Sequence, residues 1–526
     1  MTLNELLPKA VKLYPHREAV VCGPVRMSYQ KFGERVWRLC HGLSALGLRR
    51  KDRLAILHEN CHIFLETYLA AAHLGLILVP LNFRLAAKEL AMILMDSGSK
   101  VLIAHEMFRD KAAHLPAAVS GLESVVWTHR VSEKALGEKE YDYEALLLSQ
   151  EEKPVVDLSL EDDEVAHLYY TSGTTGRPKG VMLTHKNVKS HALGTIAELQ
   201  LTDKDHWFHV APLFHLADAW ATFAITWVGG KHVLVPSFDP LSVLRLIQEE
   251  KITLTNLIPT MLNVMVNHAD VGKFDYSSLR VLLSGGAPIA PEVVRRIIDT
   301  FKCDYIQTYG MTETAPYLTL SILKGHLLDK SAEEQLRFKA KTGREFIAVE
   351  LRVVDDAGQD IPQDEETVGE IIVRGDTVTP GYWQLPEETA KAFKDGWLLT
   401  GDMAVIDEEG YVTIVDRKKD VIITGGENVY STEVEHILYM HPAVLECAVV
   451  GVPDAKWGET VKGIVVVKPG HEVTEEELIG FCKDSIARFK APKSIDFLPA
   501  LPKTGSGKIE KKKLRDGYWD DHGKKV

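Results

Sequence analysis

Cysteine is scarce in this sequence, because its 526 residues include only six cysteines, scattered along the chain. No pair forms a C-x-x-C motif, and no histidines stand with the cysteines at the spacing of a zinc site. These absences exclude a disulfide-stapled scaffold and favour a reduced setting such as the cytoplasm. The cysteines are Cys22, Cys40, Cys61, Cys303, Cys447 and Cys482.

Long hydrophobic runs are also missing. The most apolar stretch, residues 68–81, contains His73 and Pro80 and is too short to span a bilayer, so it predicts a buried helix leading into a strand. The first residues lack the basic and then apolar pattern of a signal peptide, and the last ones carry neither a peroxisomal address nor a lipidation motif. We therefore expect a cytoplasmic protein without a transmembrane segment.

A surplus of positive charge is absent as well. Lysine and arginine number 61 against 74 aspartates and glutamates, which gives a net charge of −13. Without a global positive field, the chain is not expected to coat nucleic acid or an anionic membrane, although a local site for a small anion stays open. With 45% hydrophobic and 26% charged residues, the composition is that of an ordinary globular protein.

Strand-like and helix-like segments alternate over the first two thirds of the chain. This alternation predicts parallel sheets with helices on both faces, which bind ligands at the carboxyl ends of their strands. Expected strands are 53–57, 77–81, 101–104, 232–235, 252–258, 279–283 and 305–308, and expected helices are 61–74, 88–95, 241–250, 259–267 and 292–301.

The pattern changes after about residue 343. Short strands at 351–354, 370–373, 403–406 and 411–415 are separated by Asp/Gly turns, which predicts an antiparallel, barrel-like subdomain over about 343–416. The polar cluster that follows predicts a hinge at 417–420, and 421–526 are expected to form a small α+β domain. The predicted fold is therefore α/β, with two βαβ-type sheets and the barrel in a domain over 1–416, hinge-linked to a mobile C-terminal lid.

The most informative motif is the string YYTSGTTGRPKG at 169–180. It follows an apolar strand and precedes a second short apolar run. Its glycines, hydroxyl groups and Lys179 can surround phosphate oxygens closely, although the glycine spacing is not that of a Walker A loop. The string therefore predicts a phosphate-binding loop.

Further motifs follow this loop in a fixed order. They are APLFH at 211–215, SGGAP at 284–288, YGMTET at 309–314, TGD at 400–402, DRKKD at 416–420, GGEN at 425–428 and PKTGSGK at 502–508. Together with the loop, the set resembles the adenylate-forming superfamily of acyl-CoA synthetases, luciferases and peptide-synthetase adenylation domains. The resemblance covers nearly the whole chain and implies a fatty-acyl-CoA ligase that uses ATP, Mg2+ and coenzyme A.

The resemblance also implies roles for individual residues. Lys508 is the expected catalytic lysine of adenylation, Glu313 and Thr171 are expected to hold Mg2+, and Thr312 is expected to contact the α-phosphate. Asp402 is expected to accept the ribose hydroxyls, with Arg417 as a second ribose or phosphate contact. The remaining expected nucleotide contacts are Ser172, Gly173, Thr174, Thr175, Gly176, Lys179, Gly286, Ala287, Pro288, Gln307, Thr308, Tyr309, Gly310 and Met311.

A second group of implied roles concerns the thiol step. Lys419 resembles the hinge position of the superfamily, about which the small domain turns between two half-reactions. The turn brings Gly425, Gly426 and Glu427 to the tunnel through which the CoA thiol enters.

The acyl pocket is the least specific part of the resemblance. His215, Trp220, Phe223 and Leu257 are the expected lining residues. Trp220 lies one residue further from His215 than in the nearest pattern with a gating tryptophan. Ile423 stands where many fatty-acyl relatives carry a lysine that contacts ATP.

The function expected from these features is activation of a medium- or long-chain fatty acid to an acyl-adenylate, followed by transfer to CoA. A ligase for an aryl, alicyclic or short functionalised acid is the alternative, and Asp218 is the one acid in the pocket segment that could bind an amino group. A stand-alone adenylating enzyme and a non-catalytic adenylate-binding protein are further alternatives. The expected partners are the acid, ATP and CoA, without nucleic acid, and a homodimer is one expected assembly because dimers are common in the superfamily.

Overall fold

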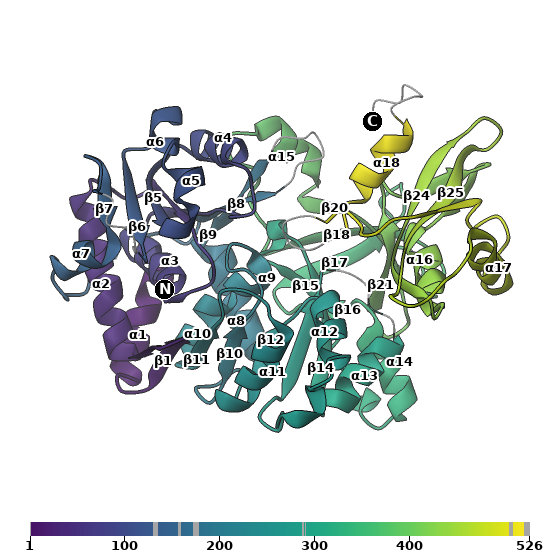
Figure 1. Ribbon diagram of the computed structural model, residues 1–526, viewed down its shortest axis with the longest axis horizontal. Helices are drawn as coiled ribbons and strands as arrows, with labels where there is room; N and C mark the ends of the chain where they lie inside the picture. The colour runs from purple at the N-terminus through teal and green to yellow at the C-terminus, as the bar shows by residue number, and fades with distance from the viewer. Residues whose placement is uncertain are drawn as a thin grey trace. The chain divides into compact units, whose positions relative to one another are not determined.

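The computed structural model describes residues 2–129, 135–155, 159–171, 178–286, 289, 291–503 and 509–519 (Figure 1). The chain divides into two compact units. Unit 1 comprises Met1–Glu350 and Val373–Leu398, and unit 2 comprises Leu351–Ile372 and Leu399–Val526. The predicted domain boundary at 417–420 stays a prediction.

The first sheet of unit 1 is mainly parallel. Its strand order is β7-β6-β5-β3-β4-β8-β9, with β8 and β9 as an antiparallel hairpin and the other neighbours parallel. The strands are β3 (Arg53–Leu57), β4 (Ile77–Pro80), β5 (Ser99–His105), β6 (Ser124–Thr128), β7 (Glu140–Asp142), β8 (Val165–Thr171) and β9 (Lys179–Thr184).

Helices cover this sheet because its strands are apolar on both sides. Leu90, Ile93 and Leu94 of α4 pack in one buried cluster with strand residues such as Leu102 and Val125. The helices of this part are α2 (Tyr29–Ala45), α3 (His62–Leu74), α4 (Ala87–Ser97), α5 (Arg109–Ala112), α6 (Leu115–Ala118) and α7 (Tyr143–Leu148).

The second sheet of unit 1 is also parallel at its centre. Neighbouring strands run in the order β16-β15-β14-β13-β12-β10-β11-β1-β2, and the pairs β1/β2, β14/β15 and β15/β16 are antiparallel. The strands are β1 (Glu18–Cys22), β2 (Val25–Ser28), β10 (His206–His209), β11 (Lys231–Leu234), β12 (Leu254–Asn256), β13 (Val281–Gly285), β14 (Asp304–Gly310), β15 (Tyr317–Leu320) and β16 (Gly343–Glu345).

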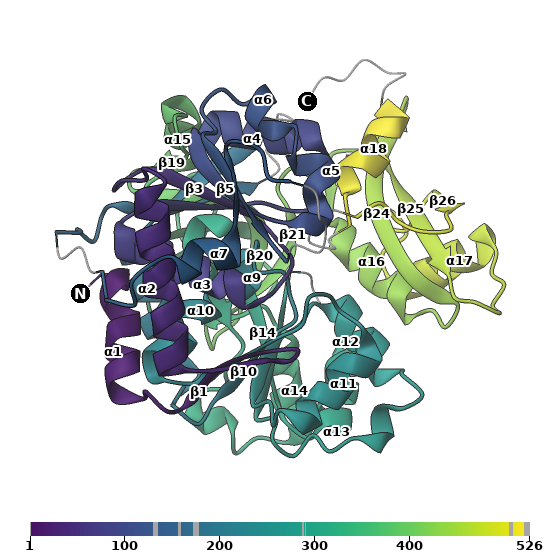
Figure 2. The same cartoon turned by 60° about the vertical axis from the view of Figure 1, so that its left-hand side comes forward.

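One face of the second sheet is covered by α11, α12, α13 and α14, which lie together in both ribbon views (Figures 1 and 2). Leu244, Leu262 and Ile297 from these helices share a buried cluster with Phe208 and Leu282 of the strands. The other helices of this part are α1 (Leu6–Leu13), α8 (His185–Glu198), α9 (Leu216–Ala219), α10 (Ala221–Val228) and α15 (Pro386–Ala392), and the covering helices are α11 (Pro240–Glu249), α12 (Pro259–Val266), α13 (Pro291–Phe301) and α14 (Ala332–Ala340).

Unit 2 contains the larger part of four neighbouring strands, of which β20 and β21 pair antiparallel, and a small α+β layer. Strands β17 (Val349–Val354), β18 (Gly369–Gly375), β20 (Trp397–Ile406) and β21 (Tyr411–Arg417) are neighbours in that order, and a second sheet has the order β23-β22-β25-β24, with β26 beside β25. The remaining elements are β22 (Ile422–Thr424), β23 (Glu427–Val429), α16 (Ser431–Met440), β24 (Val444–Asp454), β25 (Gly458–Val467), α17 (Glu475–Ser485), β26 (Ser494–Phe497) and α18 (Lys511–Trp519). Val434, Val449 and Leu478 belong to its core.

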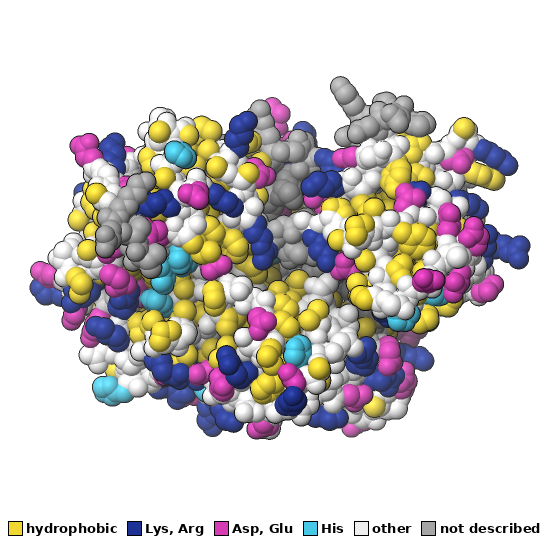
Figure 3. All heavy atoms as spheres, viewed as in Figure 1, with side chains coloured by type: hydrophobic (Ala, Val, Ile, Leu, Met, Phe, Trp, Pro, Cys, Tyr) yellow, Lys and Arg dark blue, Asp and Glu magenta, His cyan; other side chains and the backbone are white. Residues whose placement is uncertain are grey.

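The α/β class and the small C-terminal domain predicted from the sequence are thereby confirmed. In the described part of the chain, no helix combines the length and the apolar character needed to cross a membrane. Acidic and basic side chains are interspersed over the face shown in Figure 3, so the net charge is not gathered into one patch of that face.

A buried ion pair joins three helices beside the first sheet. Glu66 of α3 has a side chain with 0% exposure; Arg35 Nε of α2 lies 2.6 Å from Glu66 Oε1, and the Tyr143 hydroxyl of α7 donates to Glu66 Oε2 at 2.6 Å. Burial raises the pKa of Tyr143 well above its usual range, so the phenol remains a donor. The Glu66 carboxylate is thus stable in the core only while Arg35 accompanies it.

We predict that Arg35→Ala lowers the free energy of unfolding by about 3–5 kcal/mol, because it leaves the Glu66 carboxylate buried without its cation. Urea denaturation followed by tryptophan fluorescence measures the effect. Arg26→Ala is the matched control. Arg35 pairs with Glu66 and Glu144, and Arg26 likewise pairs with two carboxylates, those of Glu18 and Glu250, but its side chain is about half exposed. That surface change is expected to cost about 0–1 kcal/mol, and an equal cost for both variants would contradict the prediction.

Candidate active site

The predicted phosphate loop lies between the two strands of the β8–β9 hairpin. Thr171 ends β8, Lys179 begins β9, and the two residues are register partners. Ser172, Gly173, Thr174, Thr175 and Gly176 lie outside the described residues. The described ends of the loop therefore hold Thr171 and Lys179 side by side.

Lys179 has a carboxylate and an aromatic ring as neighbours. Its Nζ lies 2.5 Å from Glu388 Oε2 and 5.2 Å from the centre of the Tyr382 ring. The hydrogen bond from Lys179 is the first cause that lowers the pKa of Glu388 to about 2, so this carboxylate is ionised at neutral pH. The lysine charge is therefore held at the start of β9 by one ion pair and one cation–π contact.

Glu313 lies in the short 3-10 helix η4 (Thr312–Thr314), which packs against β9. Its side chain is mostly buried, and the Tyr382 hydroxyl donates to Glu313 Oε1 at 3.0 Å. Burial, and then the Glu313 charge, raises the pKa of Tyr382, which stays a protonated donor. Tyr382 thus contacts both predicted site residues, because Lys179 lies over its ring and its hydroxyl donates to Glu313.

The residues predicted to frame the nucleotide base lie on β13 and β14. Ser284 pairs with Gln307 and Gly285 with Thr308. A Cβ at Gly310 would lie 1.9 Å from the Pro316 carbonyl oxygen, so only glycine fits between Tyr309 and Met311. Gly286 has φ +88°, which also favours glycine, whereas Ala287 and Pro288 lie outside the described residues.

In unit 2 the structure brings Asp402 and Arg417 together. They are register partners on β20 and β21, and Arg417 Nε lies 2.6 Å from Asp402 Oδ1. Asp402 is buried, and its N–H donates to the Thr400 hydroxyl at 3.1 Å. A carboxylate held in this way can accept hydrogen bonds from two vicinal hydroxyl groups.

The predicted hinge and thiol residues also lie in unit 2. Lys419 has an exposed side chain, and its carbonyl accepts a hydrogen bond from Arg515 Nη1 at 3.0 Å. Gly425 and Gly426, with φ of +61° and +89°, make the tight turn between β22 and β23, which begins with Glu427. Lys508 lies outside the described residues.

The predicted acyl-pocket residues are distributed over several elements of unit 1. His215 precedes α9 and accepts a hydrogen bond from the Ala217 N–H at 3.2 Å. Trp220 is 2% exposed and packs edge-on against Trp207 with ring centres 4.7 Å apart, while Phe223 packs 5.9 Å from Tyr68. Leu257 is fully buried in the core of the second sheet, in the cluster that includes residues of α11 to α14.

Asp218 is occupied by buried partners. Trp207 Nε1 donates to Asp218 Oδ1 at 2.9 Å, and His209 Nδ1 lies 2.7 Å from Oδ2. The hydrogen-bonded chain extends further into the core. His209 Nε2 lies 2.9 Å from His232 Nδ1, and His232 Nε2 lies 3.0 Å from the Thr226 hydroxyl oxygen. Because both carboxylate oxygens are engaged inside the core, Asp218 serves to fix α9 against β10 rather than to present a charge to a ligand.

Sequence reasoning missed Tyr382 and Glu388. Tyr382 stands in the string TPGYW at 379–383, where a proline and a glycine precede two aromatic residues. The turn itself is visible in the sequence, but the role of Tyr382 is not, because the pairing of this segment with β9 joins residues some two hundred positions apart and appears only in the fold.

Comparison with known proteins identifies the family of the chain. Residues 7–383 match the family described as AMP-binding enzyme, and residues 433–508 match the AMP-binding enzyme C-terminal domain. The chain belongs to the AMP-binding enzyme family. It is an adenylate-forming ligase of the acyl-CoA synthetase group, with ATP and CoA as substrates and Mg2+ as the metal typical of the family.

Individual relatives extend over nearly the full chain. A feruloyl-CoA synthase from Amycolatopsis sp is 39% identical over 96% of this chain and 97% of its own length. A long-chain-fatty-acid–CoA ligase, FadD13, from Mycobacterium tuberculosis is 35% identical over 94% of this chain and 93% of its own length. The protein in the crystal structure of ATP-bound MatB from Rhodopseudomonas palustris is 30% identical in sequence. The match covers 99% of this chain and 100% of that chain, and the two structures superpose with a TM-score of 0.87.

The residue types expected at the metal site suit the expected metal. A carboxylate and the Thr171 hydroxyl are oxygen ligands, which a hard cation such as Mg2+ prefers. When bound, Mg2+ would neutralise phosphate charge.

We predict that Glu313→Gln slows formation of the acyl-adenylate by about 100-fold or more, because the amide keeps the shape of the side chain but loses the charge that attracts Mg2+. Pyrophosphate release at saturating acid measures this rate. Glu387→Gln is the control, since Glu387 is exposed in the same segment as Glu388 and is expected to leave the rate unchanged. A Glu313→Gln enzyme of normal rate and normal Mg2+ dependence would remove Glu313 from the metal site.

Proposed function

We propose that this ligase activates a medium- or long-chain fatty acid. The carboxylate oxygen attacks the α-phosphorus of ATP, the bond to the bridging oxygen breaks, and pyrophosphate leaves. The CoA sulfur then attacks the acyl carbon, AMP leaves, and the thiol proton passes to solvent. The products are acyl-CoA, AMP and pyrophosphate.

The observation that supports the adenylation step of this proposal is the contact of Tyr382 with both Lys179 and Glu313. The adenylation step brings two anions together, so it requires a fixed cation and a metal carboxylate close to one another. Lys179 supplies a point charge toward phosphate oxygens at the base of the loop, and Glu313 with Thr171 supplies oxygen ligands. Tyr382 is a positioning residue that aligns the two.

Other residues complete the proposed nucleotide site. Asp402 accepts the ribose hydroxyls and Arg417 adds a second contact, while Thr312 contacts the α-phosphate. Tyr309 stacks on adenine against the small residues at 286–288. Lys508 reaches the carboxylate and the α-phosphate during adenylation, and rotation about Lys419 then brings Gly425, Gly426 and Glu427 to the thiol.

The proposed acyl group is uncharged. His215, Trp220, Phe223 and Leu257 offer mainly apolar and aromatic surface, and the Asp218 carboxylate is already engaged by Trp207 and His209. An acid with an ammonium group would find no available counter-charge on these residues, which supports an apolar tail over an amino acid. A cytoplasmic location and a homodimer are part of the same proposal.

An aryl acid of the hydroxycinnamate type is the second candidate substrate. The feruloyl-CoA synthase that is 39% identical to this chain supports it. Aromatic side chains such as Trp220 and Phe223 can pack edge-on against a substrate ring as well as against an alkyl chain. The two candidates make opposite predictions in one substrate screen.

In that screen, AMP release with CoA is measured for linear acids from acetate to stearate and for benzoate, coumarate and ferulate. We predict the highest kcat/KM for a medium- or long-chain acid, because each buried methylene adds about 0.8 kcal/mol of favourable transfer energy. The highest kcat/KM on ferulate or coumarate would show that the substrate is an aryl acid and not a fatty acid, and would leave the proposed reaction unchanged. ADP as the product, or release that needs no acid, would contradict the reaction itself.

We predict that Lys508→Ala slows adenylation by about 100-fold or more yet spares transfer of a supplied acyl-adenylate to CoA, because the lysine charge serves only the first half-reaction. Separate assays of pyrophosphate release and of thioester formation from synthetic acyl-AMP measure the two steps. Lys512→Ala, in the following lysine run, is the control for charge alone. Equal losses in both steps would show that Lys508 does not act in adenylation specifically.

A further inference from the structure

Three neighbouring strands of the first sheet each end in a histidine. His58 follows β3, His105 is the last residue of β5, and His129 follows β6. These strands are parallel and adjacent in the order β6-β5-β3, with Leu57 beside Ala104 and His105 beside Thr128 in register. The parallel register therefore places all three imidazoles at the carboxyl edge of the sheet, where α/β proteins bind ligands.

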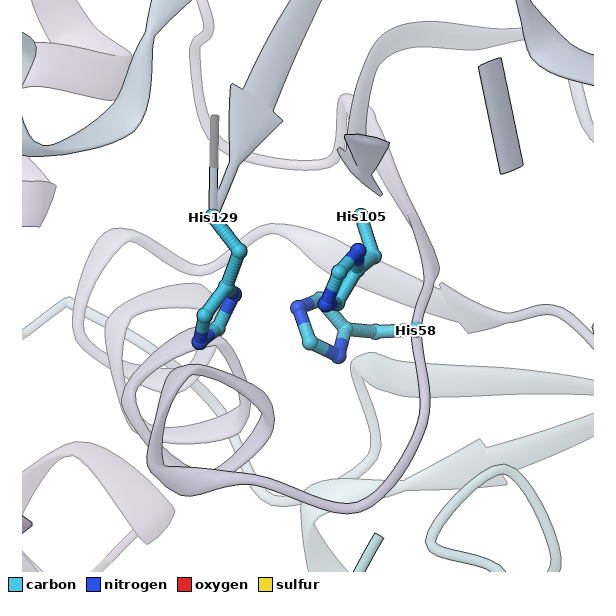
Figure 4. Close-up of side chains that lie close together, drawn as sticks. All are labelled: His58, His105 and His129. Carbon is cyan, nitrogen blue, oxygen red and sulfur yellow. The ribbon is translucent and has the colours of Figure 1, made fainter. Parts of the chain in front are cut away.

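The three rings lie close together (Figure 4). One nitrogen of each ring lies within 4.8 Å of one nitrogen of each other ring. The rings of His105 and His129 stack with centres 4.6 Å apart and an interplanar angle of 3°, and the ring of His58 meets His105 edge-on at 4.7 Å. To reach one ion, at about 2.0–2.1 Å from each nitrogen for zinc, the stacked ring of the exposed His129 has to turn out of the plane parallel to His105, because the lone pair of an imidazole lies in the plane of its ring.

Hydrogen bonds already orient the most buried ring. His58 Nδ1 lies 2.8 Å from the Glu59 carbonyl oxygen, which can only accept, so Nδ1 carries the proton. The lone pair of His58 is then on Nε2, which lies 2.8 Å from the Thr128 hydroxyl. A backbone carbonyl on the second nitrogen is the usual support of a metal-binding histidine.

An ion would replace the bond between His58 Nε2 and the Thr128 hydroxyl, and it would also replace bonds of the other two rings. His105 Nδ1 accepts from the Met107 N–H at 3.0 Å, and binding through either nitrogen of His105 replaces this bond by a metal bond. His129 Nδ1 lies 3.2 Å from the Thr128 hydroxyl. His58 is buried, His105 is half-buried and His129 is exposed, so an ion can enter from solvent at His129.

We propose that His58, His105 and His129 bind one divalent transition-metal ion, of the zinc, copper or nickel type, with water completing its coordination. Imidazole nitrogen suits these ions, whereas Mg2+ prefers oxygen ligands. The site is therefore separate in chemistry from the proposed Mg2+ site of the adenylation reaction, and it requires neither ATP nor an acid.

The test uses the full-length protein, freed of metal by a chelator and titrated with Zn2+ in a calorimeter without nucleotide. The expected result is one Zn2+ per chain, with affinity at least about 10-fold weaker in His105→Ala and in His129→Ala, because losing a ligand costs no less than losing an outer-shell partner. His114→Ala, which removes another exposed histidine of unit 1, should bind as the unchanged protein does. Excess Mg2+ should not compete.

Two further measurements keep the outcome decisive. Circular dichroism melting confirms that each variant is folded, and His129→Ala is the safest of them because its side chain is exposed. Co2+ in place of Zn2+ should give the visible absorption of a tetrahedral ion, and His129→Ala should abolish it. Absence of Zn2+ binding, or Zn2+ binding unchanged in both folded cluster variants, would overturn the proposal and leave a hydrogen-bonded histidine cluster only.

Discussion

The backbone pairing between β9 and the segment at 379–383 is the constraint on which the active site depends. The Met182 N–H donates to the Gly381 carbonyl at 3.1 Å, and the Trp383 N–H donates to the Gly180 carbonyl at 2.7 Å. Gly381 has φ +139°, and a Cβ there would lie 2.4 Å from a Thr389 methyl carbon, so the segment can pass β9 only with glycine at this place. The pairing leaves Tyr382 between Lys179 and Glu313, which lie far apart in the sequence.

The same segment controls the charge of the site. Thr379 donates its N–H to the Glu313 carbonyl at 2.8 Å, and Glu388, a few residues on, pairs with Lys179. A polyphosphate that approaches Lys179 must therefore replace a carboxylate that is already ionised. Such an exchange favours a ligand of high negative charge over a simple carboxylate, because the ligand must bind Lys179 more strongly than Glu388 does. The acidic net charge of the chain is thus compatible with the proposed binding of ATP at this local cation.

Local patterns predicted the framework well, and long-range contacts account for what they missed. The helix expected at 292–301 is α13, and the strand expected at 53–57 is β3, because each is encoded by its own periodicity. Tyr382 had no such local signal. Asp218 showed only its charge in the sequence, and its role depends on Trp207 and His209, which β10 brings to it.

The histidine cluster also depends on long-range contacts that local sequence patterns do not show. No spacing in the sequence marks His58, His105 and His129 as a set. Each stands at the end of a strand, and the parallel register of these strands brings the three residues together. Thr171 ends β8 of the same sheet, and because β8 runs parallel to β4 and β4 to β3, its hydroxyl belongs to the same carboxyl edge. One edge thus offers imidazole nitrogens at three strands and oxygen ligands at another. Since zinc-type ions prefer the nitrogens and Mg2+ the oxygens, ligand chemistry alone is enough to keep the two kinds of ion apart.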